Sequence, residues 1–492
     1  MRRWRKNTTL SQINTTPSLS FTHFFFETGG CHCHSPPYFF QLSSLIISSS
    51  QLFSLHHALS HSLTDEALNG NVSSILLLFF CVSSSFSSSS SSSSFSLPVL
   101  SPITKDHQTN QYSLSLCLKT PLEPSKLLLD LGGSFSWVDC HKHYVSSTYH
   151  HIPCNSSLCT LLSLNSCAHC YRAPSPTCAN DTCATTLHNS VTGKSIFHSA
   201  LVDAAALPTT DGRNPGRLAL LANFAFACST TDLLKGLAKG VTGSAGLGWS
   251  DLSLPVQFIA GLSLPRVFAL CLSGSPSAPG VGFYGSAGPY HFLPEIDLSK
   301  KLIYTPLLVN PYGTALDSNH GRPSDEYFIG VTALKVNGNA VDLNPALLTV
   351  DLNGNGGTKI STVAPYTVLE SSIYEALTHA FIAESAGLNL TTTVGPAVPT
   401  VDLVMQSDDV FWRIFGRNSM VRILEEGVDV WCLGFVDGGV RPRTSIVIGG
   451  HQMEDNLLQF DLGLKRLGFS SSVLVHHTMC ANFNFTSNKN LK

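Results

Sequence analysis

The stretch that most constrains the fold is Leu127–Cys140, which reads LLLDLGGSFSWVDC. An apolar run ends in a single acid, Asp130, two glycines follow, and an alternating segment runs from Phe135 to Val138. A buried strand that ends in a carboxylate, beside glycines that let the backbone turn tightly, has the form of half of an acid–base site. The alternative is a hairpin with a solvated Asp at its turn, because short motifs often match by chance. A second carboxylate elsewhere in the chain would decide between the two.

Charged residues are scarce. They make up 12% of the 492 residues, and the formal net charge is −3. The chain has no basic stripe and no long run of like charges, so we expect no nucleic-acid partner. At this length the chain can form two or more domains with cores of their own.

The fifteen cysteines indicate the compartment. Dense cysteines together with Asn-x-Ser/Thr sequons are typical of a secreted, oxidised glycoprotein. Candidate glycosylation sites beyond the leader are Asn155, Asn180, Asn389 and Asn484. The segment Cys167–Cys170 could also be half of a zinc site, but a second pair at zinc-ribbon spacing is missing, so disulfides are favoured and no metal or cofactor is expected. Ten cysteines are expected to form disulfides: Cys140, Cys154, Cys159, Cys167, Cys170, Cys178, Cys183, Cys228, Cys271 and Cys480.

Residues 1–96 differ from the rest of the chain. They are rich in Ser, Phe, Leu and His, and no Lys or Arg occurs between Lys6 and Lys105. The apolar run Val72–Val82 suits the hydrophobic region of a signal peptide and is too short to span a bilayer. We therefore expect residues 1–96 to be a disordered leader, with the natural start near Asn71. The alternative is a genuine disordered extension in which residues 72–82 act as an internal signal-anchor.

From Leu97 onward, short β-type runs alternate with Gly, Pro, Asn and Ser, which predicts an all-β fold. The clearest helix is Ser371–Ala386, with Ser371 as its N-cap. Gly243–Trp249 and Ile446–Gly450 are loose copies of one another. We therefore expect two similar β lobes, residues 97–290 and 291–486, and a tail at 487–492. The expected strands include Tyr112–Leu118, Lys126–Asp130, Phe135–Val138, Leu218–Cys228, Arg266–Leu272, Val281–Tyr284, Leu302–Leu308, Glu326–Val336, Thr444–Gly449 and Leu457–Asp461.

Six stretches together resemble the pepsin-like aspartic protease superfamily. Within it they are similar to the plant branch of xylanase inhibitors, xyloglucan endoglucanase inhibitors, extracellular dermal glycoprotein and basic 7S globulin. The stretches are Leu127–Cys140, the cluster Cys140–Cys183, Thr210–Arg217, Gly243–Phe258, Gly356–Leu377 and Arg443–Phe469. The resemblance covers nearly all of residues 100–486. It implies a two-lobed β fold with a cleft between the lobes, a disulfide-rich first lobe, secretion to the apoplast and cell wall, and six disulfides.

The resemblance also implies a catalytically inactive homologue. Active aspartic proteases share a proton between two carboxylates, each in an Asp-Thr/Ser-Gly turn whose hydroxyl braces the pair. Here the first turn, Asp130–Gly132, keeps the acid and has Leu131 in place of the hydroxyl, and the second turn has Ser361 at the acid's position. The stretch Leu187–Lys194, at the position of the flap, contains no Tyr. Asp351 is the alternative second acid, but an Asn/Gly-rich loop follows it, and it precedes the expected turn by ten residues.

The resemblance implies a different activity, in which loops block the cleft of a secreted glycoside hydrolase. The target would be a family 12 xyloglucanase-like enzyme or a xylanase, whose cleft contains two carboxylates, and arginine pairs well with carboxylates. Arg441 and Arg443 flank Pro442 on one turn, and Arg322 lies on another loop. The alternative for these arginines is a solvated turn. Trp412 is a candidate aromatic anchor, with buried packing as the alternative.

Two other functions stay open. One is a storage or signalling glycoprotein that binds peptides or sugars, and the other is an active aspartic endopeptidase. We expect a monomer that has no membrane contact once the signal is removed.

Two cysteines depart from the family pattern. Relatives carry a loop after Asn389 with a cysteine that pairs within the second lobe. That loop is missing here, so Cys432 is expected to lack its partner, and Cys117 is an additional cysteine. The two lie in different expected lobes, so we predict that both are free or mispaired.

Overall fold

The computed structural model describes residues 3–4, 96–141, 144–162, 166–313, 322–385, 395–425 and 428–488. Apart from a two-residue strand, β1 (Arg3–Trp4), and Ser96, the predicted leader lies outside the described residues, as does the sequon at Asn389. The predicted tail is described only as far as Asn488. For brevity we name residues 97–290 the N-terminal half and residues 291–486 the C-terminal half.

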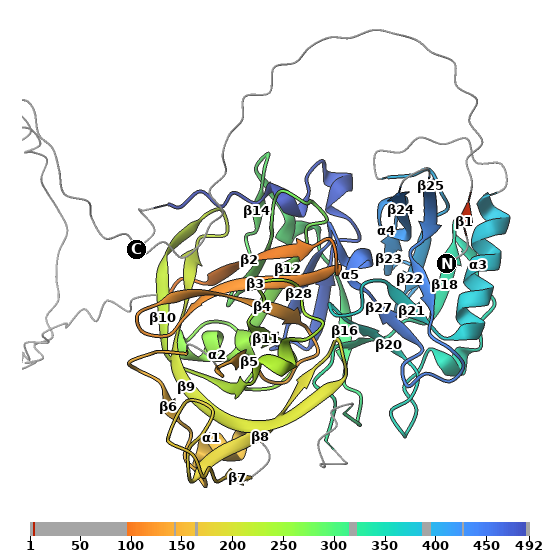
Figure 1. The fold of residues 1–492 in the computed structure, drawn as a ribbon. Coiled ribbons are helices and arrows are strands. Elements are labelled where there is room, and N and C mark those ends of the chain that lie inside the picture. The colour runs from red at the N-terminus through yellow and green to blue at the C-terminus, as the bar shows by residue number, and fades with distance from the viewer. Residues whose placement is uncertain are drawn as a thin grey trace, which may run out of the picture. The chain divides into compact units, whose positions relative to one another are not determined.

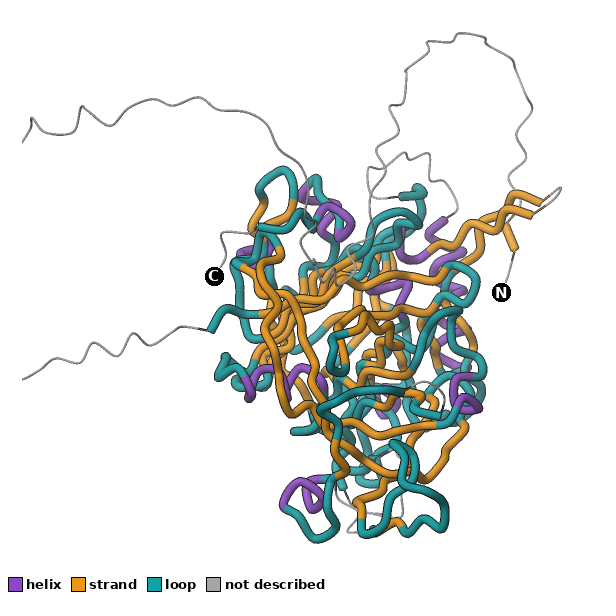
Figure 2. Tube along the Cα trace, turned by 60° about the vertical axis from the view of Figure 1, so that its left-hand side comes forward, coloured by secondary structure: helices purple, strands orange, loops and turns teal. Residues whose placement is uncertain are grey.

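Strands dominate both halves, and the helices are few and short (Figures 1 and 2). The predicted all-β, pepsin-like fold class is confirmed. The strands of the N-terminal half are β2 (Val99–Asp106), β3 (Gln111–Leu118), β4 (Glu123–Asp130), β5 (Trp137–Asp139), β6 (His150–His151), β7 (Cys167–Ala168), β8 (Thr182–Asn189), β9 (Lys194–Thr210), β10 (Pro215–Ser229), β11 (Gly243–Gly246), β12 (Val267–Cys271) and β13 (Gly280–Tyr284).

The C-terminal half contains shorter strands. They are β14 (His291–Phe292), β15 (Ile296–Asp297), β16 (Ile303–Leu308), β17 (Phe328–Ile329), β18 (Ala333–Val336), β19 (Asn339–Ala340), β20 (Thr358–Ile360), β21 (Thr367–Leu369), β22 (Val401–Val404), β23 (Phe411–Ile414), β24 (Met420–Glu425), β25 (Val428–Leu433), β26 (Phe435–Asp437), β27 (Ile446–Ile448), β28 (Leu457–Asp461) and β29 (Arg466–Phe469). The α-helices of the described residues are α1 (Ser157–Leu161), α2 (Leu254–Gly261), α3 (Ser371–Ser385), α4 (Gly416–Ser419) and α5 (Gly450–Met453). The 3₁₀ helices are η1 (Thr231–Leu234), η2 (Leu298–Lys301), η3 (Pro345–Leu347), η4 (Val473–His476) and η5 (Cys480–Asn482).

Two of the differences from the sequence prediction concern the pairing of a strand and the start of a helix in the C-terminal half. The strand predicted over Glu326–Val336 is divided into β17 and β18, because β17 pairs with β16 and β20 whereas β18 pairs with β19 and β22. Helix α3 begins at Ser371, and the prediction that Ser371 is its N-cap is wrong. The carboxylate of Glu370 accepts from Ser372 N at 2.8 Å and Ile373 N at 3.3 Å, and a negative charge at this end also suits the helix dipole.

One antiparallel sheet takes strands from both halves. Its order is β2, β13, β12, β28, β29, β16, and the halves meet where β12 pairs with β28 (Figure 1). Phe268 lies opposite Phe460 at this junction, and their rings stack at a centroid distance of 4.7 Å. The lobe boundary predicted at residues 290 and 291 stays a prediction, and the hydrogen-bonded sheet continues across it.

The two sequence copies support equivalent turns in the two halves. In the first, β4 ends at Asp130 and pairs in parallel with β11, where Gly246 lies opposite Asp130. A Cβ at Gly246 would lie 2.6 Å from Gly133 O, so only glycine allows this close approach. In the second, β20 ends just before Ser361 and pairs in parallel with β27, and Ser361 N donates to Ile448 O at 2.9 Å.

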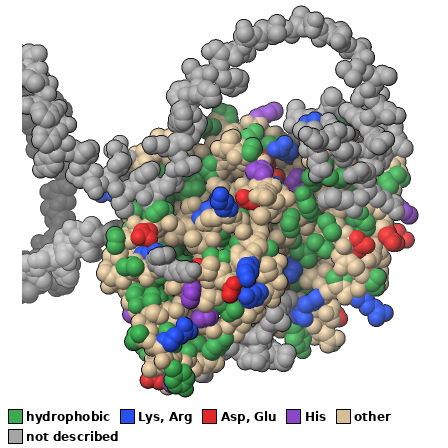
Figure 3. Space-filling model, in the orientation of Figure 1, with side chains coloured by type: hydrophobic (Ala, Val, Ile, Leu, Met, Phe, Trp, Pro, Cys, Tyr) green, Lys and Arg blue, Asp and Glu red, His purple; other side chains and the backbone are tan. Residues whose placement is uncertain are grey.

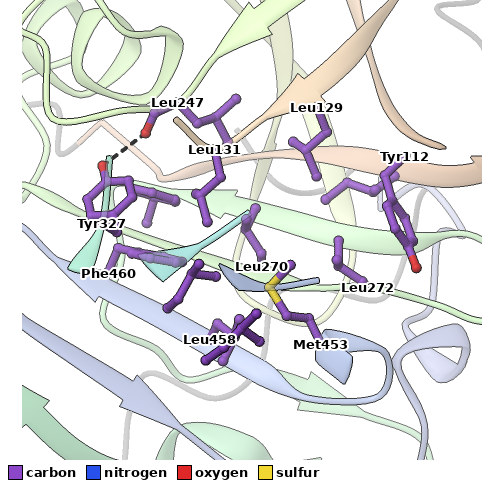
Figure 4. Packing of buried hydrophobic residues seen from close by; sticks show 14 of the residues in the cluster. Tyr112, Leu129, Leu131, Leu247, Leu270, Leu272, Tyr327, Met453, Leu458 and Phe460 are labelled. Carbon is purple, nitrogen blue, oxygen red and sulfur yellow. Dashed lines mark hydrogen bonds between the residues drawn. The ribbon is translucent and has the colours of Figure 1, made fainter. Parts of the chain in front are cut away.

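A hydrophobic core lies against both turns. Figure 4 shows Leu129 and Leu131 in the same buried cluster as Tyr327 and Phe460 of the C-terminal half. The hydroxyl of Tyr327 donates to Leu247 O at 2.9 Å, which satisfies a buried polar group between the halves (Figure 4). The core therefore includes contacts that cross from one half to the other.

The structure pairs all ten cysteines that were expected in disulfides. The bridges are Cys140–Cys228, Cys154–Cys167, Cys159–Cys183, Cys170–Cys178 and Cys271–Cys480. Cys167 and Cys170 belong to different bridges, so the zinc alternative does not hold for them. Cys432 is free and buried, as predicted. Cys117, predicted to be free or mispaired, is disulfide-bonded and is not a free thiol.

The described part of the chain contains neither a membrane-spanning helix nor a cluster of metal-ligating side chains. None of its helices has both the length and the apolar character needed to cross a membrane. Within the same residues, no group of three or more His, Cys, Asp or Glu side chains is placed to hold a metal ion.

Candidate functional site

The carboxylate of Asp130 is buried at the end of β4. The hydroxyl of Ser190 donates to its Oδ2, and the backbone N–H of Gly132 donates to its Oδ1 at 3.1 Å. Burial raises the pKa of Asp130 above its usual range, and the hydrogen bonds from Ser190 and Gly132 act in the opposite direction. Asp130 is therefore an enclosed carboxyl whose charged form is disfavoured.

The second turn contributes a hydroxyl to the first. Thr362 is buried, and its Oγ1 donates to Leu129 O at 2.6 Å and accepts from Leu131 N at 3.0 Å. Leu131 has no hydroxyl with which to make the reciprocal contacts. Ser361 is only partly buried, and its Oγ accepts from Val363 N and Ala364 N of its own turn at 3.3 Å. The side-chain hydrogen bonding between the turns therefore runs in one direction, and among the described residues the carboxylate of Asp130 accepts hydrogen bonds only from Ser190 and Gly132.

An ion pair that sequence reasoning missed lies beside the first turn. Lys359 Nζ contacts Glu326 Oε1 at 2.6 Å, and both side chains are largely buried. A Cβ at Gly132 would lie 3.1 Å from Glu326 Cγ, and the negative charge of Glu326 adds to the raised pKa of Asp130. Glu326 and Lys359 are brought together by the pairing of β17 with β20. The one signal in the sequence was a lysine two residues before Ser361.

The hairpin of β8 and β9, which contains the predicted flap segment Leu187–Lys194, is held over the first turn by hydrogen bonds. Trp137 Nε1 donates to His188 O at 3.0 Å. Asn189 Nδ2 donates to Leu233 O at 2.7 Å and to Lys235 O at 3.1 Å. Together with the hydrogen bond from Ser190 to Asp130, these bonds hold the hairpin turn against the carboxylate.

The arginines predicted to contact a partner are all exposed in the C-terminal half. Arg443 Nη2 donates to Tyr312 O at 2.9 Å and to Gly313 O at 3.3 Å, and Gly313 N donates to Arg322 O at 2.8 Å. The structure thus brings Arg443 and Arg322 to one loop. Arg441 lies two residues before Arg443, in a left-handed backbone conformation with φ +58°.

Exposed apolar side chains and one acid accompany these arginines. Tyr312 is 42% exposed, Leu352 is 91% exposed and Val440 is 77% exposed. Hydrogen bonds from the backbone of Asn355 lower the pKa of Asp351, and the charge of Arg443 acts in the same direction. Asp351 therefore belongs to the loop beside Arg443, with its carboxylate bonded to that loop. We name Asn310–Gly313, Asp351–Gly357 and Asp437–Arg443 the three rim loops.

Trp412, a candidate aromatic anchor, is buried instead, so the packing alternative holds. It is 0% exposed and stacks on Phe469 at a centroid distance of 5.6 Å. Alternation along β23 places Trp412 and Ile414 on the core face and Arg413 on the other face, where Arg413 binds Asp402 through two hydrogen bonds of 2.7 Å. On the face drawn in Figure 3, Lys and Arg occur in separate small groups, without a continuous basic field.

The described sequons differ in accessibility. Asn155 and Asn180 are exposed, and Asn180 Oδ1 accepts from Cys170 N at 2.8 Å. Asn484 is partly buried, and its side chain accepts from Thr486 N at 3.0 Å. Their glycosylation stays a prediction.

The chain matches known proteins along most of its described length. The family model for the xylanase inhibitor N-terminal region matches residues 112–286, and the model for the xylanase inhibitor C-terminal region matches residues 326–471. Probable aspartic proteinase GIP2 of Nicotiana benthamiana is 49% identical over 408 residues, which cover 79% of this chain and 92% of that protein. A crystal structure of edgp has a TM-score of 0.78 at 48% identity and covers 80% of this chain and 100% of its own. A crystal structure of basic 7S globulin from soybean has a TM-score of 0.67 at 31% identity, and the match covers 79% of this chain and 98% of that chain. The resemblance stated from the sequence is confirmed, and the chain belongs to the xylanase-inhibitor-type family of pepsin-like proteins.

Proposed function

We propose that this protein inhibits secreted microbial glycoside hydrolases, with a family 12 xyloglucanase-type target favoured over a xylanase. The main support for this proposal is the way in which Arg443 is held. Its two hydrogen bonds to the described residues both come from Nη2, so Nε and Nη1, with three N–H groups, remain available to a partner. Charge-assisted bonds from these groups suit the paired carboxylates of a glycosidase cleft.

The surroundings of Arg443 support the same proposal. Exposed Tyr312, Leu352 and Val440 provide apolar contact area around the charge, as in protein interfaces that surround a buried anchor with apolar contacts. Arg322, on the loop that Arg443 bonds, is a second cation for the same partner. We prefer the xyloglucanase-type target because the stretch Gly438–Gly450 is closer to the dermal-glycoprotein-like inhibitors.

Proteolysis is not part of the proposal. A protease of this fold needs two carboxylates that share a proton, and Asp130 is bound to Ser190 while Ser361 stands at the expected position of the second acid. The five disulfides between described residues and the exposed sequons support an extracellular location in the plant cell wall.

The test is titration of the full-length secreted protein against a purified family 12 xyloglucanase and a purified xylanase. We expect inhibition of the xyloglucanase, and Arg443→Ala should weaken it by more than about tenfold because the charged contact is lost. Arg217→Ala, at an exposed arginine of the N-terminal half, is the matched control and should change nothing. Unchanged potency of the Arg443 variant would remove the rim loops from the mechanism.

A second candidate is a storage or signalling glycoprotein that binds peptides or sugars. It is favoured by the likeness to basic 7S globulin. Correctly folded protein that inhibits neither hydrolase would support this second function. A haemoglobin digest that pepstatin blocks would instead establish an active endopeptidase.

A further inference from the structure

We propose that Asn310 is a positioning residue that holds Arg443 ready for a partner. The role of Arg443 in binding a hydrolase rests on the proposed function, whereas the positioning of Arg443 does not. Asn310 is 0% exposed and lies just after β16, where the chain enters the first rim loop.

The side chain of Asn310 joins two rim loops. Its Nδ2 donates to Gly354 O at 2.9 Å, and its Oδ1 accepts from Tyr312 N at 3.0 Å. The first bond crosses 44 residues of sequence, and the second shapes the local turn. One buried amide therefore fixes the conformation of its own loop and the distance to the next loop.

Arg443 is attached to the same two loops. Its guanidinium donates to the carbonyls of Tyr312 and Gly313 in the first loop, and its own carbonyl accepts from Gly356 N of the second loop at 2.8 Å. The bond from Asn310 to Gly354 completes a closed set of contacts among the three rim loops. If that bond is lost, the two attachments of Arg443 can move apart.

Gly354 shows how closely these groups approach. A Cβ at this position would lie 2.6 Å from Asn310 Oδ1, 2.9 Å from Tyr312 Cβ and 3.1 Å from Arg443 Nη2. Its φ of +77° also favours glycine. The amide, the exposed tyrosine and the guanidinium therefore meet at one backbone position, and the amide is the buried member.

Holding an arginine in place favours binding. A free arginine side chain loses rotamer freedom when a partner captures it, and prior ordering removes part of that cost. The unbonded Nε and Nη1 groups then face a partner from a guanidinium that is already fixed through Nη2.

The first experiment is trypsin cleavage of the full-length native protein at Arg443–Thr444. Cleavage there requires local opening, because Arg443 is bonded through both its side chain and its backbone and Thr444 is buried. Arg441 is followed by proline and is not a competing site. We expect Asn310→Ser to raise the initial rate of this cleavage about tenfold, because serine is too short to reach Gly354 O.

Asn418→Ser is the matched control. Asn418 is a buried asparagine whose Nδ2 donates to the carbonyls of His451 and Glu454, outside the rim loops. This variant should lose comparable thermal stability without faster cleavage at Arg443–Thr444. If Asn310→Ser misfolds, Gly354→Ala tests the same contact from the other loop. Equal rates for the rim and control variants would overturn the proposal.

The second experiment measures inhibition in a double-mutant cycle. Asn310→Ser should weaken inhibition about tenfold when Arg443 is present and leave it unchanged in the Arg443→Ala background, because Asn310 acts through Arg443. Equal losses in both backgrounds would contradict the positioning role. If the wild-type protein inhibits no hydrolase, the proposed function fails, and the trypsin experiment still decides whether Asn310 positions Arg443.

Discussion

The first turn, Asp130–Gly132, keeps a carboxylate without a hydroxyl, and the second turn, Ser361–Val363, keeps a hydroxyl without a carboxylate. The retained groups differ in their surroundings. Thr362 bonds two backbone groups of the other half, at 2.6 and 3.0 Å. Asp130 accepts a hydrogen bond from Ser190, and burial disfavours the ionised form of its carboxyl group. The hydroxyl therefore stabilises the junction of the halves, whereas the acid is a buried group whose charge opposes folding.

The hydroxyl of Thr362 thus joins the two turns without a carboxylate beside it in its own turn. Leu131 replaces a hydroxyl with a fully buried apolar side chain, so the first turn gains core packing and loses its half of the brace. Four substitutions test the comparison.

The largest effect is expected from Leu131→Thr, which returns a hydroxyl to the first turn. We expect a loss of roughly 2–5 kcal/mol in the free energy of unfolding, because buried apolar contacts are removed and a hydroxyl enters the core. Leu131→Val is the matched variant without the hydroxyl. Urea denaturation of both variants isolates the effect of the hydroxyl on the free energy of unfolding. If Leu131→Thr is as stable as Leu131→Val, the new hydroxyl forms hydrogen bonds with the second turn.

Thr362→Val tests the retained half of the brace. It leaves Leu129 O and Leu131 N buried without their partner, so we expect a loss of roughly 2–4 kcal/mol. Thr358→Val is a sharp control, since Thr358 is also buried and its Oγ1 has no partner among the described residues. A Thr362 variant as stable as the Thr358 variant would show that the junction does not depend on the hydroxyl.

Asp130→Asn tests the carboxylate through pH. The folded-state pKa of Asp130 is raised, so ionisation destabilises the folded protein as pH rises through that value. The variant should be more stable than wild type at pH 7, and the difference should shrink as pH falls to about 4, near the unfolded pKa. Asp351→Asn should behave oppositely, because the pKa of Asp351 is lowered and its stabilisation is present at neutral pH. A pH-independent difference for Asp130→Asn would contradict the assigned cause.

Ser361→Ala should have the smallest effect. The hydroxyl accepts two bonds of 3.3 Å from its own turn, at a partly exposed position, so we expect a change of less than about 0.5 kcal/mol. Thermal unfolding of the variant beside Thr362→Val checks this. A loss above about 1 kcal/mol would mean that Ser361 supports the junction as Thr362 does.

Much of the fold could be predicted because its signals are local. The short β-type run predicted at Leu457–Asp461 forms β28 with the same bounds, and the two copied segments contain the strands that support the two turns. The site was predictable only in part. Asp130 was found from its own motif, and Ser361 and Arg443 were found through the family resemblance. The contact of Ser190 with Asp130 follows from how the β8–β9 hairpin folds back.

Local patterns were enough to predict the β class, the first turn at Asp130 and the oxidised cysteine set, because apolar alternation, glycine turns and cysteine content are properties of short stretches. The second turn at Ser361 was placed by the family resemblance. Tertiary structure decided the rest. Successive side chains of β23 point to opposite faces of the strand, and only the packing of the strand shows that Trp412 faces the core. The pair Glu326–Lys359 and the bond from Asn310 to Gly354 join residues far apart in the chain. Sheet pairing and loop closure set the distances between such residues, so no local sequence pattern encodes these contacts.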